Sequence, residues 1–217
     1  MKRIAKFNSI RIYHDKKNII DQIWDRKNEK SQKSCFFLEK KISGEDTFSK
    51  KERILNKINY DFLILTSSES ICWLMNLRGF DLEHTPIVFS RAILTKTSIK
   101  LFIDLNKFSY LEKVKGVQIL CFRKFESEIL KLPKNKRLAL DSSSSFFYYE
   151  LMKSSGLKLD LIEDPCIKIR CQKNKVEIKH SIKSHILDGV ALVKFFYWLE
   201  KEKFSSYLDE LNISRKL

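Results

Sequence analysis

The stretch FLILTSSESICWLMNLRG, residues 62–79, decides the fold class. Its first four residues, Phe62–Leu65, form a continuous apolar run, which is typical of a strand buried on both faces. Ser67 or Ser68 can cap the helix that follows, which we expect to run from Glu69 to Leu77. A buried strand that leads directly into a helix is the repeating unit of an α/β domain with a mostly parallel or mixed sheet.

The same alternation continues along the chain. Further strands are expected at Pro86–Leu94, Ile99–Asp104, Val117–Phe122, Arg137–Asp141 and Lys158–Ile162, with helices near Asn106–Lys113, Phe125–Leu132 and Ser144–Ser154. We therefore predict one α/β domain over residues 38–170, with a central sheet of five or six strands and helices on both faces. Its predicted core includes Leu63, Leu65, Ile71, Trp73, Leu74, Ile93, Phe102, Leu138 and Leu140.

The flanking regions follow a different pattern. Ile10–Tyr13 reads as a short strand before an amphipathic helix, and residues 26–34 contain no apolar side chain, which is typical of a solvated linker. Ser49 with Glu52 forms a capping-box pattern that opens a helix. Asn174 begins a helix of about thirty residues that is apolar almost all round near its end, so we expect the domain to self-associate, to aggregate or to need a companion polypeptide.

Composition excludes several classes of protein. Of the 217 residues 43% are hydrophobic and 12% aromatic, which is enough for a packed core and argues against global disorder. No apolar run is long enough for a transmembrane helix, and no secretory signal is visible at the start. The five cysteines are odd in number and include no CxxC pair, so we expect reduced thiols in a cytoplasmic protein.

The net charge of +15 raises the question of nucleic-acid binding. Residues 1–57 alone carry 16 basic and 8 acidic groups, and 32 of the 42 basic residues are lysine, whereas base readout favours arginine. Specific nucleic-acid binding is therefore not expected. A stand-alone basic interaction module with weak nucleic-acid affinity is the alternative function, and a steep salt dependence of binding would distinguish it.

Candidate catalytic and metal-binding patterns are sparse. His180 and His185 are five residues apart, about 140° around a helix axis, and cannot hold one metal ion together. His84 lies in a polar loop with Asp81 and Glu83, where a loop-positioning role is favoured over metal binding. Ser142–Ser145 lacks the glycines of a nucleophile elbow and reads as a strand-to-helix turn.

One segment carries a family resemblance. Glu69–Pro86, ESICWLMNLRGFDLEHTP, closely resembles the xIxWLxNLRGxDxxxxP stretch of three-domain Xaa-Pro aminopeptidases (aminopeptidase P) of the creatinase/prolidase superfamily. The likeness continues in order through the LFID strand within Ile87–Asp104, the DPC joint at Asp164–Cys166, the KN-E entry at Lys173–Ile178 and the DGxAxxxFxxWLE helix at Asp188–Glu200. Asn18–Trp24 is similar to the NLVDxxW end of the family's first domain.

This resemblance implies a fold and a division into domains. The fold is a creatinase N-terminal-like, ribonuclease H-like α/β domain with a mixed sheet, followed by the helical stub of a pita-bread domain. Residues 1–37 correspond to the tail of a first creatinase N-like domain and a linker, residues 38–170 to the second such domain, and residues 171–217 to the start of the pita-bread catalytic domain. The chain is thus similar to the middle of a three-domain enzyme.

The resemblance also implies chemistry that lies outside the chain. The complete enzymes remove N-terminal residues before proline with two divalent metal ions, typically manganese, held by two Asp, one His and two Glu of the pita-bread domain. All five ligands follow the part that this chain matches. We therefore expect no cofactor, metal ligand or catalytic residue here, and a fragment, inactive alone, that acts as a structural, substrate-cleft and oligomerisation domain.

The residues that the resemblance places at the substrate cleft are Arg78, Asp81, Glu83 and His84. A guanidinium suits carboxylate recognition, so Arg78 can orient a peptide end, although a structural donor role is favoured for it. The expected partner is a separate polypeptide that carries the rest of the peptidase, or a second copy of this chain. Peptide substrate is expected only in the complete enzyme, and no membrane is involved.

Overall fold

The computed structural model describes residues 20, 23, 34–108, 114, 116–202 and 208–217. The chain divides into two compact units, residues 1–31 and 32–217, and nearly all of the described residues belong to the second. The expected strand at Ile10–Tyr13, and almost all of the helix and linker after it, lie outside the described residues. The three-part domain division stays a prediction.

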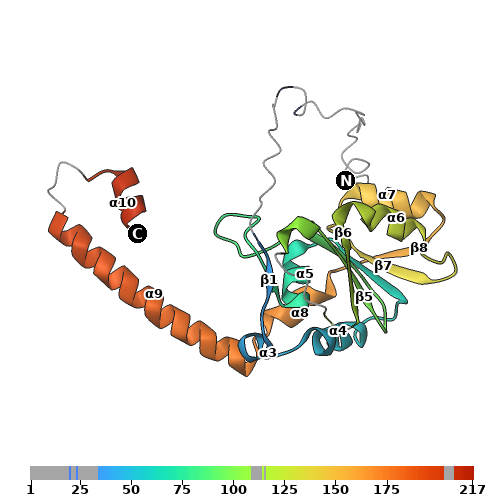
Figure 1. Cartoon of the computed structure of the whole chain (residues 1–217), viewed down its shortest axis with the longest axis horizontal. Helices are drawn as coiled ribbons and strands as arrows, with labels where there is room; N and C mark the ends of the chain where they lie inside the picture. The colour runs from blue at the N-terminus through green and yellow to red at the C-terminus, as the bar shows by residue number, and fades with distance from the viewer. Residues whose placement is uncertain (1–19, 21–22, 24–33, 109–113, 115, 203–207) are drawn as a thin grey trace, which may run out of the picture. The chain divides into compact units, whose positions relative to one another are not determined.

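The second unit is built on a six-stranded mixed sheet (Figure 1). Its strands are β2 (Phe62–Leu65), β4 (Ser90–Leu94), β5 (Ile99–Ile103), β6 (Val117–Cys121), β7 (Arg137–Asp141) and β8 (Lys158–Ile162), in the order β6-β5-β4-β2-β7-β8. β4 pairs antiparallel with both of its neighbours, and the pairs β5·β6, β2·β7 and β7·β8 are parallel. The prediction of a five- or six-stranded mixed sheet is confirmed.

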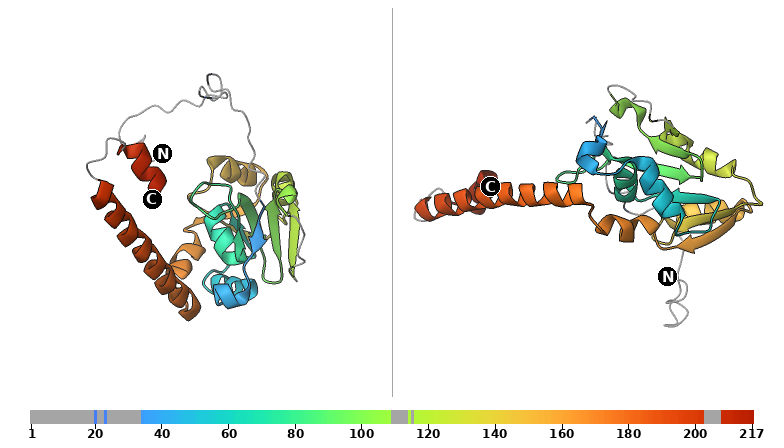
Figure 2. Two further views of the ribbon diagram at one scale, coloured as in Figure 1. Left: turned by 60° about the vertical axis from the view of Figure 1, so that its left-hand side comes forward. Right: turned by 90° about the horizontal axis from the view of Figure 1, so that it is seen from below.

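The apolar run of β2 explains why helices cover both faces of this sheet (Figure 2). Leu63, Ile64 and Leu65 are all fully buried, but Leu63 and Leu65 belong to one core cluster and Ile64 to the other. The first cluster includes side chains of α4 (Thr47–Leu55), α5 (Ser68–Met75) and α8 (Pro165–Cys171). The second includes side chains of α6 (Phe125–Leu130) and α7 (Phe146–Ser154). Side chains alternate across a strand, so a run without polar residues needs cover on both sides.

Eight of the nine predicted core residues are buried, and Trp73 is the exception. Trp73 is half-buried because it lines a pocket, and the Nζ of the buried Lys50 lies 4.7 Å from the centre of its ring. Its position on the helix still faces the first core cluster. The helical spacing therefore identified the correct face of the helix, and the pocket leaves this side chain at the edge of the core.

Two helix boundaries differ from the sequence prediction. α5 ends at Met75 rather than Leu77, because Asn76 adopts a left-handed conformation (φ 53°) and ends the helix there. The next two residues form β3 (Leu77–Arg78), which pairs antiparallel with β1 (Phe36–Phe37). α4 is capped by Asp46, whose carboxylate accepts hydrogen bonds from the Ser49 backbone (2.9 Å) and hydroxyl (3.0 Å), so the expected Ser49–Glu52 box does not open it.

The expected cap at the start of α5 is confirmed, since the Ser67 hydroxyl accepts a bond from the Ser70 backbone N–H (3.4 Å). The shorter elements are α3 (Lys40–Ser43) and the 3₁₀ turns η1 (Leu105–Lys107) and η2 (Phe122–Lys124). The strand expected from Pro86 begins only at Ser90, because the preceding residues belong to a loop.

The long C-terminal helix begins where the sequence predicted. Asn174 caps α9 (Lys175–Glu202): its Oδ1 accepts bonds from the backbones of Val176 (2.9 Å) and Glu177 (3.0 Å), and the Glu177 carboxylate accepts one from the Asn174 backbone (2.8 Å). α10 (Glu210–Lys216) follows, capped by Asp209. None of the helices in the described ranges is long and apolar enough to cross a membrane.

Candidate functional site

Arg78 lies in β3, directly after the C-terminal end of α5. Its side chain is half-buried, and Nη1 donates to the carbonyls of Cys72 (3.1 Å) and Leu77 (2.8 Å). Burial lowers the pKa of this guanidinium, and no carboxylate of the described residues lies within ion-pair distance of it. Arg78 is thus a partly desolvated cation that is bound on one side to main-chain carbonyls.

Lys50 is a second cation at the same helix end, and the sequence analysis did not single it out. It is 2% exposed, and Nζ donates to the Trp73 carbonyl (2.9 Å) and the Asn76 Oδ1 (2.6 Å). Burial lowers the Lys50 pKa to about 8. The last carbonyls of a helix have no partner inside the helix, so Lys50 and Arg78 together satisfy the end of α5.

Asp81 holds the loop that leaves this helix end. Its side chain is 1% exposed, pairs with the Lys107 ammonium of η1 and accepts a hydrogen bond from the Phe89 backbone (2.7 Å). The Asp81 backbone N–H donates to the Ile87 carbonyl (3.1 Å), which closes the loop on itself. Asp81 therefore stabilises the conformation of the loop.

Glu83 and His84 lie at the tip of this loop. Their side chains are 87% and 90% exposed, and the nearest polar atoms of the pair are 3.8 Å apart. His84 has a positive φ of 60°, as befits a tight turn. The four predicted cleft residues therefore do not converge: Arg78 and Asp81 are held inside, whereas Glu83 and His84 point to solvent from the described part of the domain.

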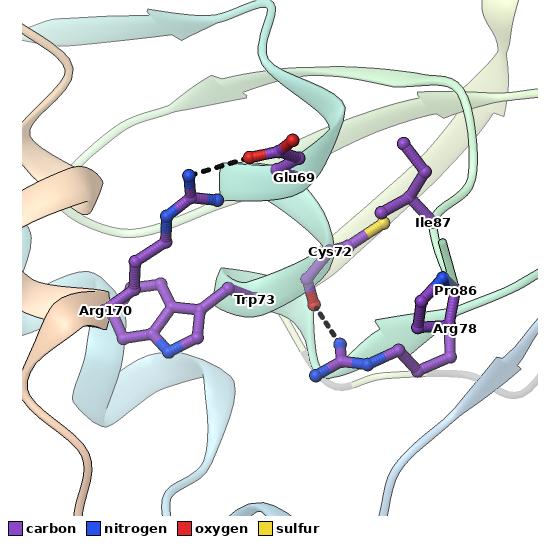
Figure 3. A pocket seen from close by; sticks show the side chains of 7 residues that line it. All are labelled: Glu69, Cys72, Trp73, Arg78, Pro86, Ile87 and Arg170. Atoms are coloured by element: carbon purple, nitrogen blue, oxygen red, sulfur yellow. Dashed lines mark hydrogen bonds and ion pairs between the residues drawn. The ribbon is translucent and has the colours of Figure 1, made fainter. Parts of the chain in front are cut away.

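A pocket of about 260 Å³ opens beside Arg78 (Figure 3). Among the predicted cleft residues only Arg78 lines it. α5 and α8 contribute an ion pair at its edge, in which Nη2 of Arg170 lies 2.8 Å from Oε2 of Glu69. The full lining is Glu69, Cys72, Trp73, Arg78, Pro86, Ile87 and Arg170.

The described residues do not fit a two-metal centre. No group of three or more His, Cys, Asp or Glu side chains within them could hold a metal ion. His180 and His185 are both exposed on α9, and Nδ1 of His185 lies 2.8 Å from the Ser181 carbonyl of its own helix. We therefore derive no metal-dependent step from this part of the chain.

Comparison with known proteins identifies the family. Residues 25–177 match the Creatinase/Prolidase N-terminal domain, so the chain belongs to that family. A probable Xaa-Pro aminopeptidase P from Pyricularia oryzae is 32% identical over 92% of this chain and 36% of its own length. The Xaa-Pro aminopeptidase ApepP from Drosophila melanogaster is also 32% identical, over 92% of this chain and 34% of its own length.

A solved structure supports the fold. The X-prolyl aminopeptidase from Caenorhabditis elegans, described as a cytosolic enzyme with a di-nuclear active site, superposes with a TM-score of 0.81. It covers 99% of this chain, this chain covers 37% of it, and the two sequences are 22% identical. The creatinase N-terminal-like fold is therefore confirmed, and the chain spans about a third of the relatives that it matches.

Proposed function

We propose that this chain works as the N-terminal part of an Xaa-Pro aminopeptidase, in which it forms a wall of the substrate cleft and a docking surface for the catalytic part. The observation that carries the proposal is coverage: 92% of the chain matches aminopeptidase relatives, but only 34–36% of their length is involved. In this proposal the cleavage chemistry belongs to the remaining two thirds of such an enzyme.

α9 supports the docking part of this proposal. No residue of the helix is buried, although apolar side chains recur along it at spacings of three and four residues. A Cβ added at Gly189 would meet nothing within 4 Å, so the close neighbour that an interior glycine favours is not found in the described residues. The exposed apolar residues of α9 are Ile178, Ile182, Ile186, Leu187, Val190, Leu192, Val193, Phe196 and Tyr197.

Exposed apolar surface of this length is a mark of a protein interface. The occupant we propose is the catalytic part that the relatives carry beyond the match, as a continuation of the same chain or as a separate polypeptide. Self-association of α9 is the outcome expected when that part is absent. Within the cleft wall, the chain's own contribution is to bind and orient the peptide, with Arg78 as the candidate for a carboxylate.

A chimera tests the proposal. The third of Drosophila ApepP that this chain matches is replaced by this chain, and hydrolysis of an Xaa-Pro peptide is measured after the chimera is shown to be folded and loaded with metal. We expect cleavage by the chimera. A matched variant, Val193→Lys with Phe196→Lys, should lose cleavage because it places charges on the exposed apolar surface of α9. A folded, metal-loaded chimera without activity contradicts the proposal.

A further inference from the structure

We infer that the pocket beside Arg78 is a binding site for a carboxylate that is attached to a small apolar group. The inference deepens the proposed function and rests on it only for the source of the ligand, a peptide. Binding itself is a property of the described residues and is testable on this chain alone.

One positive group in the lining, the Arg78 guanidinium, has no carboxylate of the described residues within ion-pair distance, although Glu177 attracts it from farther away. Glu69 is the carboxylate in the lining, and its Oε2 is already paired with Arg170 at 2.8 Å. Nη1 of Arg78 donates hydrogen bonds to two main-chain carbonyls, and the other guanidinium nitrogens make no hydrogen bond within the described part of the chain. A half-buried cation without a direct ion pair is costly to keep out of water, and an incoming carboxylate would offset part of that cost.

The geometry of the guanidinium suits the same ligand. Because Nη1 is held by the Cys72 and Leu77 carbonyls, the plane of the Arg78 fork is fixed before any ligand arrives. Charge-assisted hydrogen bonds from a guanidinium to a carboxylate are among the stronger polar contacts in proteins, and little side-chain freedom remains to be lost here. The site is therefore preorganised for an anion.

The other walls of the pocket are apolar. Trp73, Pro86 and Ile87 contribute apolar side chains to the lining (Figure 3). The volume of about 260 Å³ lies just below the range of roughly 300–1,000 Å³ that is usual for small-molecule sites. It suits a group of about one or two amino-acid residues, with its carboxylate at Arg78 and its apolar side against Trp73 and Ile87.

Two probes that differ only in charge test the inference. The full chain is titrated with N-acetyl-leucine and with the neutral N-acetyl-leucinamide, while NMR follows the Nε–H of Arg78 and the indole N–H of Trp73. We expect the acid to shift both signals saturably and to bind about tenfold or more tightly than the amide. A tripeptide that ends in leucine separates the sources: tighter binding than the free acid points to a peptide end, and weaker binding to a small organic acid.

Two variants, one inside the pocket and one outside it, show whether the acid binds in the pocket. Ile87→Trp fills the pocket but leaves every hydrogen bond of Arg78 in place, so it should abolish binding of the acid while the Nε–H signal of Arg78 shows that the site is still folded. Phe89→Trp adds the same ring at an exposed position outside the pocket lining and should bind like the wild type. Equal shifts by acid and amide, or full binding by Ile87→Trp, would overturn the inference even if the ApepP chimera is active.

Discussion

Replacing Lys50 by methionine should remove a pH dependence of stability. The wild-type ammonium is 2% exposed, and burial lowers its folded-state pKa from 10.5 to about 8. The charges of Glu177 and Glu45 oppose this shift, and those of Arg78 and Arg53 add to it. Since Lys50 is then more protonated in the unfolded chain than in the folded one between these two values, its contribution to the free energy of unfolding rises as the pH increases through that window.

The size of the effect follows from the two pKa values. The difference between a pKa of 10.5 and one of about 8 corresponds to about 3 kcal/mol of unfolding free energy. The folded state is less stable by this amount at low pH, where Lys50 is protonated in both states, than at high pH, where it is neutral in both. Raising the pH from about 7 to about 9.5 should restore about 2 kcal/mol of it. Methionine has no proton to lose, so the variant lacks this gain, although it also leaves the Asn76 and Trp73 acceptors without their donor.

Urea unfolding of the wild type and the variant at about pH 7 and about pH 9.5, under reducing conditions, measures the difference. The readout is the change between the two pH values, because the lost hydrogen bonds affect both equally. Lys57→Met is the matched control: Lys57 is exposed in the turn two residues after the end of the same helix, so its removal changes the net charge alone and should keep the wild-type pH dependence. If Lys50→Met and wild type gain the same stability with pH, the ammonium is not desolvated as argued.

Three other outcomes follow from the structure. Leu63→Ala in the centre of the sheet should lower the free energy of unfolding by about 2–5 kcal/mol in urea denaturation, and an unchanged midpoint would contradict its burial. Gly44→Ala should lower the melting temperature more than Gly156→Ala: both have φ +75°, but only at Gly44 would the new Cβ lie 2.3 Å from Oδ1 of Asn174. The chain alone should sediment as a concentration-dependent oligomer through α9, and Phe196→Lys should weaken this; a monomer at high concentration would refute it.

The elements of the sheet were predictable because their signals are local. Each strand of the sheet carries apolar side chains, in a run or in alternation, between turn residues, and the caps at Ser67 and Asn174 use hydrogen bonds to backbone groups within three residues. The Ser49–Glu52 pattern failed because an equally local competitor, Asp46, caps the helix instead. The end of α5 was missed because an asparagine in a left-handed conformation is permitted by its sequence but not required by it.

The sequence by itself determined the family register, the six strands of the central sheet, and the approximate positions of α4, α5, α6, α7 and α9. Only the tertiary structure decided which charged side chains are buried. Lys50 belongs to a polar stretch of the sequence, yet the packing of α4 against α5 buries its ammonium beside Trp73. Arg78 lies next to a pocket, whereas His84, six residues later, is exposed to solvent. Desolvation of a charge depends on neighbours distant in the chain, here 23 residues away, whereas periodicity and capping depend on neighbours three or four residues away.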